Sequence, residues 1–375
     1  MLQLPGKLTA ESFLAGYWQK EPLFMPAACV PPIAAITRNE LAWLATLDDV
    51  ESRIVRTDRS GGELRYRAES GPFDESDLRA LPPRDWTLLV HDVEKHLPAL
   101  RKLFALVPFI PDWRIDDLMV SFAAPGGSVG PHRDHYDVFL CQGIGVRQWR
   151  VSAADVAKND RASADLALLE EFEGDVYEAR AGDVLYLPPG VAHWGTARRA
   201  CITYSIGMRA PQVSDIADAL PDAAQSNPFY ADPDLMPCEA RPGWIAPQAI
   251  VRASLLVGKP ARGDTLTGES LGRFVTGTKS WLAPERLGRA EAEAVLRAVS
   301  RNGKLPVHGM ARVAYDEHKA YVNGRSHALP DGGAELLAEI CASRRVAFPV
   351  RRGEGREELL IWMLESGAFE IPGNL

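Results

Sequence analysis

Residues 115–209 alternate short apolar runs with glycine and proline turns, and this alternation constrains the fold more than any other feature of the chain. The runs with strand character are 117–123, 136–142, 146–152, 176–179, 184–187 and 201–208. Turn residues such as Pro125-Gly126-Gly127 and Pro188-Pro189-Gly190 separate them. Many short strands joined by tight turns are typical of a β-sandwich or a barrel of the jelly-roll kind. We therefore predict one of these two folds in this region.

Helical patterns precede the barrel. The first lies near residues 11–19, and the second follows Thr37 and Glu40, which form a capping-box pattern. Further runs predict strands at 53–57, 63–68 and 86–91 and a helix at 93–104. Together with the barrel, these elements predict a mixed α+β fold.

The strand pattern stops beyond Ala210. Residues 213–265 combine short helical stretches with proline-rich breaks, which indicates a separate helical unit or an oligomer contact. The last hundred residues hold three helical runs and a small hairpin, an arrangement that resembles a winged helix. The helical runs are 286–299, 333–342 and 356–365, and the hairpin strands are 311–315 and 319–322. We place the breaks between these parts near residues 210 and 275.

The charge balance bears on the winged-helix-like end. The chain carries 42 Lys and Arg against 50 Asp and Glu, a formal net charge of -8, which argues against a protein that grips phosphate backbones. Residues 276–375 carry 14 Lys and Arg against 13 Asp and Glu. We interpret this nearly neutral end as a packing or protein-contact domain and expect no direct nucleic-acid binding. The rest of the chain is acidic, which suits a basic partner.

The cysteines and the apolar runs bear on the cellular compartment in which the protein is expected. Five cysteines are widely spaced and form no CxxC pair: Cys29, Cys141, Cys201, Cys238 and Cys341. We interpret them as reduced thiols. No run is long enough to span a bilayer, and the first ten residues lack the build of a signal peptide. We expect a soluble, cytoplasmic protein that makes no contact with a membrane.

The stretch from Pro125 to Phe139 carries the chemistry. If His132 and Asp134 lie on a strand, they face the same way, because side chains alternate with a period of two. His193, after the turn at residues 188–190, then supplies a third ligand at the mouth of the barrel. Two histidines and one carboxylate leave open the positions at which non-haem Fe(II) binds a co-substrate and O2. His135 has the opposite parity and is expected to point away from the metal.

Arg147 lies on the strand after the Gly143-Ile144-Gly145 turn. A dicarboxylate such as 2-oxoglutarate needs a cation deep in the pocket, and a guanidinium grips a carboxylate through two parallel hydrogen bonds. Arg147 and Trp149 share one face of the strand, whereas Arg150 lies on the other. We therefore expect Arg147 inside the barrel and Arg150 outside.

Other polar clusters have simpler interpretations. His91, Asp92, Glu94 and His96 lie where a strand becomes a helix and are interpreted as solvated surface rather than as a second metal site. His308, His318 and His327 lie apart from clustered acids or thiols and are interpreted as structural. The sequence contains no GxGxxG motif after a strand, no Walker-type loop and no GxSxG elbow, which excludes the commonest nucleotide-binding and hydrolase patterns.

Three long motifs resemble one family. The segments 117–122, 132–139 and 142–149 are similar to those of the JmjC-type ribosomal oxygenases, in particular the bacterial arginine hydroxylases that modify a large-subunit ribosomal protein. Phe13-Leu14, residues 17–23 and residues 204–211 also look like that family. The resemblance covers the whole chain and is densest between residues 117 and 211. Arg147 stands where much of the wider JmjC group has lysine, which favours the bacterial ribosomal branch.

The resemblance implies an architecture. It comprises a JmjC catalytic domain over residues 1–210, built on a double-stranded β-helix of the jelly-roll or cupin kind, a helical dimerisation segment over 211–275 and a winged-helix-like domain over 276–375. It also implies an Fe(II)-dependent enzyme that uses 2-oxoglutarate and O2 and hydroxylates an arginine β-carbon of a basic ribosomal protein. A homodimer is expected.

The resemblance also implies roles for individual residues. His132, Asp134 and His193 would hold the iron, and Arg147, with help from Ser121, would hold the far carboxylate of 2-oxoglutarate. The positions that line the channel for the target arginine are Asp117, Met119, Tyr136 and Ser205. Asp117 suits a guanidinium, while Tyr136 and Met119 suit its apolar stem.

Two other functions stay open at this point. One is the same chemistry on a histidine or another residue, because the pocket lining selects the target and the metal ligands do not. The other is a metal-binding cupin without redox activity, such as an isomerase or a sensor. Arg147 distinguishes the non-redox cupin from the oxygenase, because only a dicarboxylate co-substrate requires this arginine.

Overall fold

The computed structural model divides the chain into two compact units. It describes residues 1–30, 32–59, 64–159, 166–216, 227–237, 241–258, 265–300, 303–349 and 355–371. Unit 1 comprises Met1–Val107, Asp116–Met208 and Pro233–Met236, and unit 2 comprises Pro108–Ile115, Arg209–Asp232 and Pro237–Leu375.

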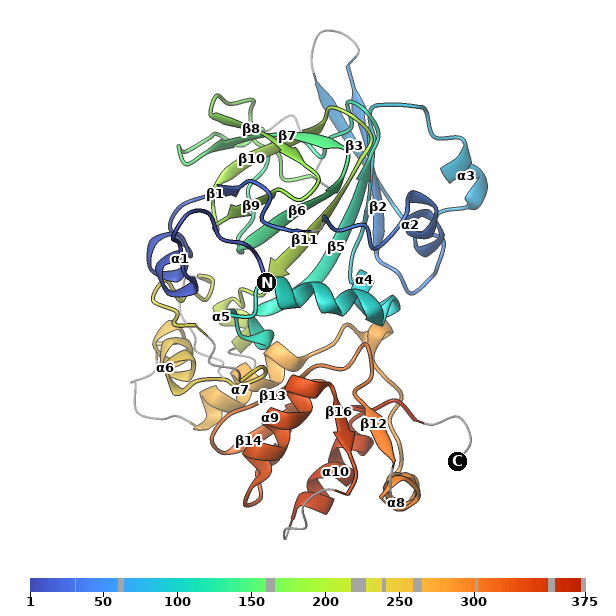
Figure 1. Cartoon of the computed structure of the whole chain (residues 1–375), viewed down its shortest axis with the longest axis vertical. Helices are drawn as coiled ribbons and strands as arrows, with labels where there is room; N and C mark the ends of the chain where they lie inside the picture. The colour runs from blue at the N-terminus through green and yellow to red at the C-terminus, as the bar shows by residue number, and fades with distance from the viewer. Residues whose placement is uncertain are drawn as a thin grey trace. The chain divides into compact units, whose positions relative to one another are not determined.

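Unit 1 contains two β-sheets (Figure 1). The larger sheet has eight strands in the order β1 (Leu23–Met25), β9 (Val184–Leu187), β6 (Val138–Ile144), β11 (Cys201–Met208), β5 (Ile115–Ala123), β4 (Trp86–Val90), β2 (Ser52–Asp58) and β3 (Arg65–Ser70). The smaller sheet has the order β10 (Ala192–Ala197), β7 (Val146–Ser152) and β8 (Asp175–Arg180). The predicted barrel and the mixed α+β content are confirmed.

The two sheets face each other across one apolar core. Val138, Leu140, Leu185 and Leu187 of the large sheet belong to the same buried cluster as Trp149, Val151 and Ala179 of the small sheet. The odd-numbered positions of β7 therefore point inward. The core thus fixes which side chains face the interior of the barrel.

The outer face of the large sheet is covered by α1 (Ala10–Gly16). Its Phe13 ring lies 5.8 Å from the Phe139 ring and 5.0 Å from the Tyr186 ring. The strands β6 and β9 are consequently buried on both faces, which explains why residues 138–141 and 184–187 are continuously apolar rather than alternating.

Of the remaining helices of unit 1, α2 (Arg38–Leu44) was predicted, α3 (Glu75–Arg79) was not, and the helix predicted over 93–104 is interrupted. The helix α2 begins with the capping box of Thr37 and Glu40, and α3 follows β3. The helix predicted over 93–104 is instead a short α4 (Val93–His96) and a 3-10 helix over Pro98–Leu106. Pro98 lacks the backbone N–H that a continuous α-helix requires, which explains the break.

Unit 2 consists of helices around two small sheets. Its helices are α5 (Val213–Ile216), α6 (Pro247–Leu256), α7 (Thr265–Thr276), α8 (Arg289–Val299), α9 (Gly333–Ser343) and α10 (Arg356–Glu365), with 3-10 turns at Asp112–Arg114 and Ser280–Leu282. One sheet pairs β12 (Lys304–Pro306) with β16 (Arg345–Ala347), and the other orders β13 (Val313–Tyr315), β14 (Lys319–Val322) and β15 (Arg325–Ala328).

Close packing joins the helices of unit 2 to its three-stranded sheet. A Cβ added at Gly272 of α7 would lie 2.4 Å from the Tyr321 ring of β14, so only glycine permits this approach. Both the 211–275 segment and the 276–375 segment lie mainly in this unit. The three-part division drawn from the sequence stays a prediction.

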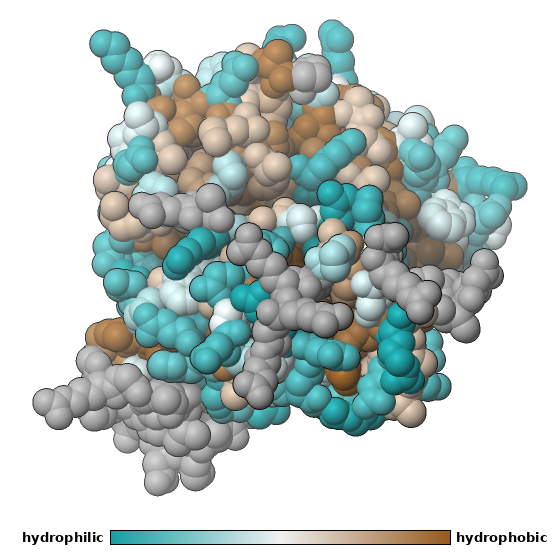
Figure 2. Space-filling model, turned by 60° about the horizontal axis from the view of Figure 1, so that its bottom comes forward, coloured by the Kyte–Doolittle hydropathy of each residue, from teal (hydrophilic) through white to brown (hydrophobic). Residues whose placement is uncertain are grey.

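Two further expectations concern the thiols and the surface. Cys29, Cys141, Cys201 and Cys341 are free and buried, as predicted, and Cys238 lies outside the described residues. Among the described helices, none has the length and apolar character needed to cross a membrane. Figure 2 shows one face of the molecule, on which hydrophilic residues lie in many places among apolar ones.

Candidate active site

His132 and His193 are brought together by a single pair of backbone hydrogen bonds. The His132 N–H donates to the His193 carbonyl at 3.0 Å, and the His193 N–H donates to the His132 carbonyl at 2.8 Å. Asp134 joins them, since the Gly190 N–H donates to its carbonyl at 2.8 Å. Ligand atoms of His132, Asp134 and His193 all lie within 4.8 Å of one another.

The local structure differs from the prediction in one respect. His132 forms an isolated bridge and Asp134 lies in a loop, so the expectation that both lie on one strand is wrong. His193 lies on β10 (Ala192–Ala197), a strand that the sequence pattern does not predict, because the turn residues Pro188-Pro189-Gly190 precede it directly. The isolated bridge between His132 and His193 and the backbone hydrogen bond from Gly190 to Asp134 therefore assemble the cluster, rather than strand alternation.

Both imidazoles are oriented by backbone carbonyls. The Nδ1 atom of His132 lies 3.0 Å from the Gly130 oxygen, and the Nδ1 atom of His193 lies 3.0 Å from the Val191 oxygen. These carbonyls accept hydrogen bonds from the Nδ1–H groups, which leaves the Nε2 lone pairs available to a metal. Burial, followed by the neighbouring His132, lowers the pKa of His193 to about 4. The neutral, metal-binding form of His193 is therefore favoured.

Trp149 separates the His-Asp-His cluster from Arg147. Its ring lies 6.0 Å from the His193 ring, and the Arg147 guanidinium carbon lies 5.4 Å from the Trp149 ring centre. The register between β10 and β7 places His193 opposite Val151, Gly195 opposite Trp149 and Ala197 opposite Arg147. Directly opposite residues point to the same face, so these side chains form one row inside the barrel.

Gly195 makes room for the Trp149 ring, and we expect Gly195→Ala to destabilise the barrel. The new Cβ would lie 2.5 Å from Trp149 Cζ3, and overpacking of this kind costs about 1–3 kcal/mol. Urea denaturation should show a free energy of unfolding lowered by that amount. Gly16→Ala is the matched control, because a Cβ there meets nothing within 4 Å. Equal stability of the two variants would contradict the packing argument.

Arg147 is a buried cation without an acidic partner among the described residues. Its Nη1 lies 3.4 Å from Ser121 Oγ, and its buried Nε has no hydrogen-bond partner among the protein's described atoms. Arg150 lies on the opposite face, where it donates to the Phe172 carbonyl at 3.0 Å. A buried guanidinium with spare donors is suited to a carboxylate ligand.

The four predicted substrate positions lie on neighbouring parts of the large sheet and its adjoining loop. Asp117 and Met119 share the face of β5 that carries Ser121, and Ser205 of β11 lies opposite the core residue Leu140. Tyr136 lies in the loop before β6 and is 40% exposed. Partial burial of its hydroxyl, followed by the carboxylates of Asp134 and Asp117, raises the pKa of Tyr136.

A glycine shapes the space between two of these residues. A Cβ added at Gly207 would lie 3.1 Å from Asp117 Oδ1 and 3.9 Å from Tyr136 Cε2. Asp117 and Tyr136 therefore flank a space that a larger residue at position 207 would narrow.

The polar cluster at residues 91–96 is not solvated surface, and that interpretation is wrong. Asp92 and Glu94 are 2% and 1% exposed, and Lys95 is also buried. The cluster packs against β5, since Glu94 Oε2 accepts from the Leu118 N–H at 2.9 Å. The Lys95 ammonium hydrogen-bonds the Asp92 carboxylate, which permits these charges to be buried. Sequence periodicity gave no signal for this burial, because the burial depends on packing against β5, which lies further along the chain.

We expect Glu94→Gln to flatten the dependence of stability on pH. Burial raises the pKa of Glu94 to about 7, above its ordinary value. The stabilising, protonated form is therefore fully present below about pH 4.5 and is lost as the pH rises through 7. Glutamine stays neutral at every pH. Between pH 5 and pH 8, the free energy of unfolding of the variant should therefore rise by about 3 kcal/mol relative to that of the parent.

Urea denaturation at the two pH values measures this effect. Glu21→Gln, at an exposed position, controls for the loss of one negative charge. Identical pH profiles for the parent and Glu94→Gln would contradict a raised pKa at Glu94.

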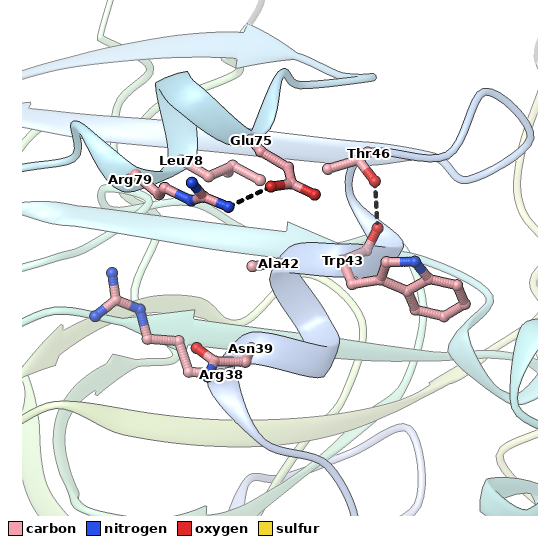
Figure 3. A pocket seen from close by; sticks show the side chains of 8 residues that line it. All are labelled: Arg38, Asn39, Ala42, Trp43, Thr46, Glu75, Leu78 and Arg79. Atoms are coloured by element: carbon pink, nitrogen blue, oxygen red, sulfur yellow. Dashed lines mark hydrogen bonds and ion pairs between the residues drawn. The ribbon is translucent and has the colours of Figure 1, made fainter.

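A groove elsewhere in unit 1 contains none of the predicted site residues. It has a volume of about 500 Å³ and lies between α2 and α3. Figure 3 shows its lining residues: Arg38, Asn39, Ala42, Trp43, Thr46, Glu75, Leu78 and Arg79. It offers no cluster of metal-binding side chains, so the chemistry of unit 1 centres on the His-Asp-His cluster.

The donor set of the cluster fits a divalent transition metal. Two neutral imidazoles with oriented Nε2 atoms and one carboxylate are the protein ligands of a facial triad. A double-stranded β-helix that carries this triad is the arrangement of the cupin-type non-haem iron oxygenases, of which the JmjC proteins are one class. In agreement, a family model described as "JmjC domain" matches residues 102–216.

Known proteins place the chain within this class. It is 39% identical over 241 residues to the Escherichia coli (strain K12) ribosomal protein uL16 3-hydroxylase, and the match covers 63% of each protein. A probable ribosomal oxygenase of Haemophilus influenzae is 36% identical over 236 residues, or 62% of this chain and 56% of the relative. These matches thus span less than two thirds of the curated relatives' length.

Solved structures match over the full length. The crystal structure of the Escherichia coli ribosomal oxygenase YcfD is 30% identical, with a TM-score of 0.73 over 99% of both chains. The YcfD complex with cobalt and 2-oxoglutarate is 30% identical, with a TM-score of 0.71 over 100% of both chains. The protein belongs to the ribosomal oxygenase family.

Proposed function

We propose that the protein is an Fe(II)- and 2-oxoglutarate-dependent oxygenase that hydroxylates an arginine of a large-subunit ribosomal protein at the β-carbon. The observation that carries the proposal is the row inside the barrel, in which the His-Asp-His cluster and the buried Arg147 flank Trp149. The name of one relative, ribosomal protein uL16 3-hydroxylase, supports the proposal.

The triad and Arg147 divide the work of holding the reactants. His132, Asp134 and His193 would hold Fe(II), and the bound ion, with 2-oxoglutarate and O2 as co-substrates, would supply the oxidising power for hydroxylation of a C–H bond with release of succinate and carbon dioxide. Arg147 grips the far carboxylate of 2-oxoglutarate, and Ser121 adds a hydroxyl beside Nη1. The protein's own part is positioning, because the backbone carbonyls at Gly130 and Val191 fix the two imidazoles.

The substrate side chain is bound by the residues around Gly207. Asp117 pairs with the guanidinium, while Met119 and Tyr136 pack against the aliphatic stem. Ser205, buried on β11, offers a hydroxyl to the same space. An arginine rather than a neutral side chain is selected because a partly buried carboxylate requires a cation.

Mass spectrometry tests this function. The protein is incubated with Fe(II), 2-oxoglutarate and a purified uL16 homologue, and the peptide that gains the mass of one oxygen atom is sequenced. The proposal predicts the gain on an arginine, dependent on 2-oxoglutarate. A gain on a histidine would favour the alternative target, and no gain with intact metal and 2-oxoglutarate binding would contradict an oxygenase for this substrate.

We also propose an assembly for the enzyme. Residues 211–275 form a helical dimerisation segment and residues 276–375 a winged-helix-like domain that binds protein rather than nucleic acid, in a cytoplasmic homodimer. The near-neutral charge of residues 276–375 supports the last point. Light scattering on the purified chain tests the dimer, and a salt-sensitive affinity for RNA or DNA would contradict the protein-contact role.

A further inference from the structure

Asp117 is held by the turn between β4 and α4. His91 Nδ1 lies 3.2 Å from Asp117 Oδ2, and the Asp92 N–H donates to the same oxygen at 3.4 Å. Both contacts engage Oδ2. Oδ1 instead faces Gly207, where an added Cβ would lie 3.1 Å from it. The two oxygens of one carboxylate thus have different surroundings.

The turn that makes these contacts is built from buried charges and an uncommon backbone conformation. Asp92 has φ 54° and ψ 29°, in the left-handed region that residues other than glycine rarely adopt. Lys95 hydrogen-bonds the Asp92 carboxylate, and Glu94 accepts from the Leu118 N–H at 2.9 Å. The turn therefore holds both the side chain of Asp117 and the backbone that follows it. Such conformations persist where the surroundings fix them, often beside functional sites.

We propose that His91 is a positioning residue that fixes the Asp117 carboxylate through Oδ2 so that Oδ1 is presented to the substrate guanidinium. This inference rests on the proposed function, in which Asp117 pairs with the target arginine. A guanidinium donates along fixed directions, so a carboxylate that rotates freely binds it less well than one held in place. His91 is one-third exposed at its side chain, and its loss removes a hydrogen bond without opening the core.

Peptide affinity and specificity test the inference. A fluorescent synthetic peptide from uL16 that contains the target arginine is titrated into the full chain, and its anisotropy gives Kd. We expect His91→Ala to raise Kd about tenfold, as for loss of one hydrogen bond to a charged group. His91→Asn should restore affinity, because its amide N–H can occupy the place of Nδ1. His318→Ala, an exposed histidine in unit 2, is the matched control.

A double-mutant cycle separates positioning from general damage. In an Asp117→Asn background, His91→Ala should change Kd less than about twofold, because the group that it positions has been altered. Two outcomes would overturn the inference about His91 while leaving the proposed function intact, provided that the parent hydroxylates the peptide. One is an equal loss of affinity in both backgrounds, and the other is parent-like affinity in His91→Ala. A parent that neither binds nor hydroxylates the peptide would overturn the proposed function and this inference together.

Discussion

Replacement of Asp134 with alanine will abolish 2-oxoglutarate-dependent succinate formation. Asp134 provides the carboxylate of the three-residue cluster, whose ligand atoms lie within 4.8 Å of one another. Two imidazoles alone bind Fe(II) weakly and do not fix three adjacent open positions. We expect a fall of at least about a thousandfold in turnover. Succinate release, measured with and without the ribosomal protein substrate, gives the result.

The neighbouring histidine supplies the control for this experiment. His135 is exposed and is not part of the metal-binding group found among the described residues. His135→Ala should therefore retain metal binding, whereas Asp134→Ala should lose it in a direct Co(II) titration followed by absorbance. Full turnover in Asp134→Ala would rule out the triad.

Replacement of Arg147 with alanine will raise the KM for 2-oxoglutarate about 100-fold. The substitution removes two charge-assisted hydrogen bonds to the far carboxylate, which together are worth about 3 kcal/mol. The KM of Arg147→Lys should lie between that of the parent and that of Arg147→Ala, because an ammonium keeps the charge but lacks the planar fork of donors. The KM for the ribosomal protein should change little, because Arg147 is not among the residues proposed to bind the target arginine.

Arg150→Ala is the matched control for Arg147→Ala. Both arginines lie on β7, but Arg150 lies against the Trp194 ring, 5.4 Å from its centre, on the outer face. Its loss should leave the KM for 2-oxoglutarate unchanged. If Arg147→Ala and Arg150→Ala behaved alike, the barrel would be a metal-binding cupin that does not use this co-substrate.

The sequence predicted the barrel because its signals are local. Short apolar runs and glycine or proline turns mark β5 to β9 and β11 within a few residues of their observed ends. Parity placed Arg147 and Trp149 inside and Arg150 outside, as the structure has them. These inferences need only the period of a strand and the chemistry of each side chain.

The parts that could not be predicted depend on partners far away along the chain. The sequence pattern does not predict β10, because Pro188-Pro189-Gly190 precede it directly and Gly195 interrupts it; only the structure shows that the Trp149 ring requires that glycine. The burial of Glu94 in α4 depends on the Leu118 N–H of β5. Local patterns carry no information on such pairings, so they predict a solvated surface for this charged run.

The paired backbone hydrogen bonds between His132 and His193 have a consequence for metal loading. They join two segments 61 residues apart, and the carbonyls of Gly130 and Val191 orient the imidazoles. These contacts use backbone atoms and Nδ1, which take no part in binding the metal, so we expect them to persist when the metal is removed. Chelation should thus be fully reversible: the stripped chain stays folded and regains its metal without passing through an unfolded state.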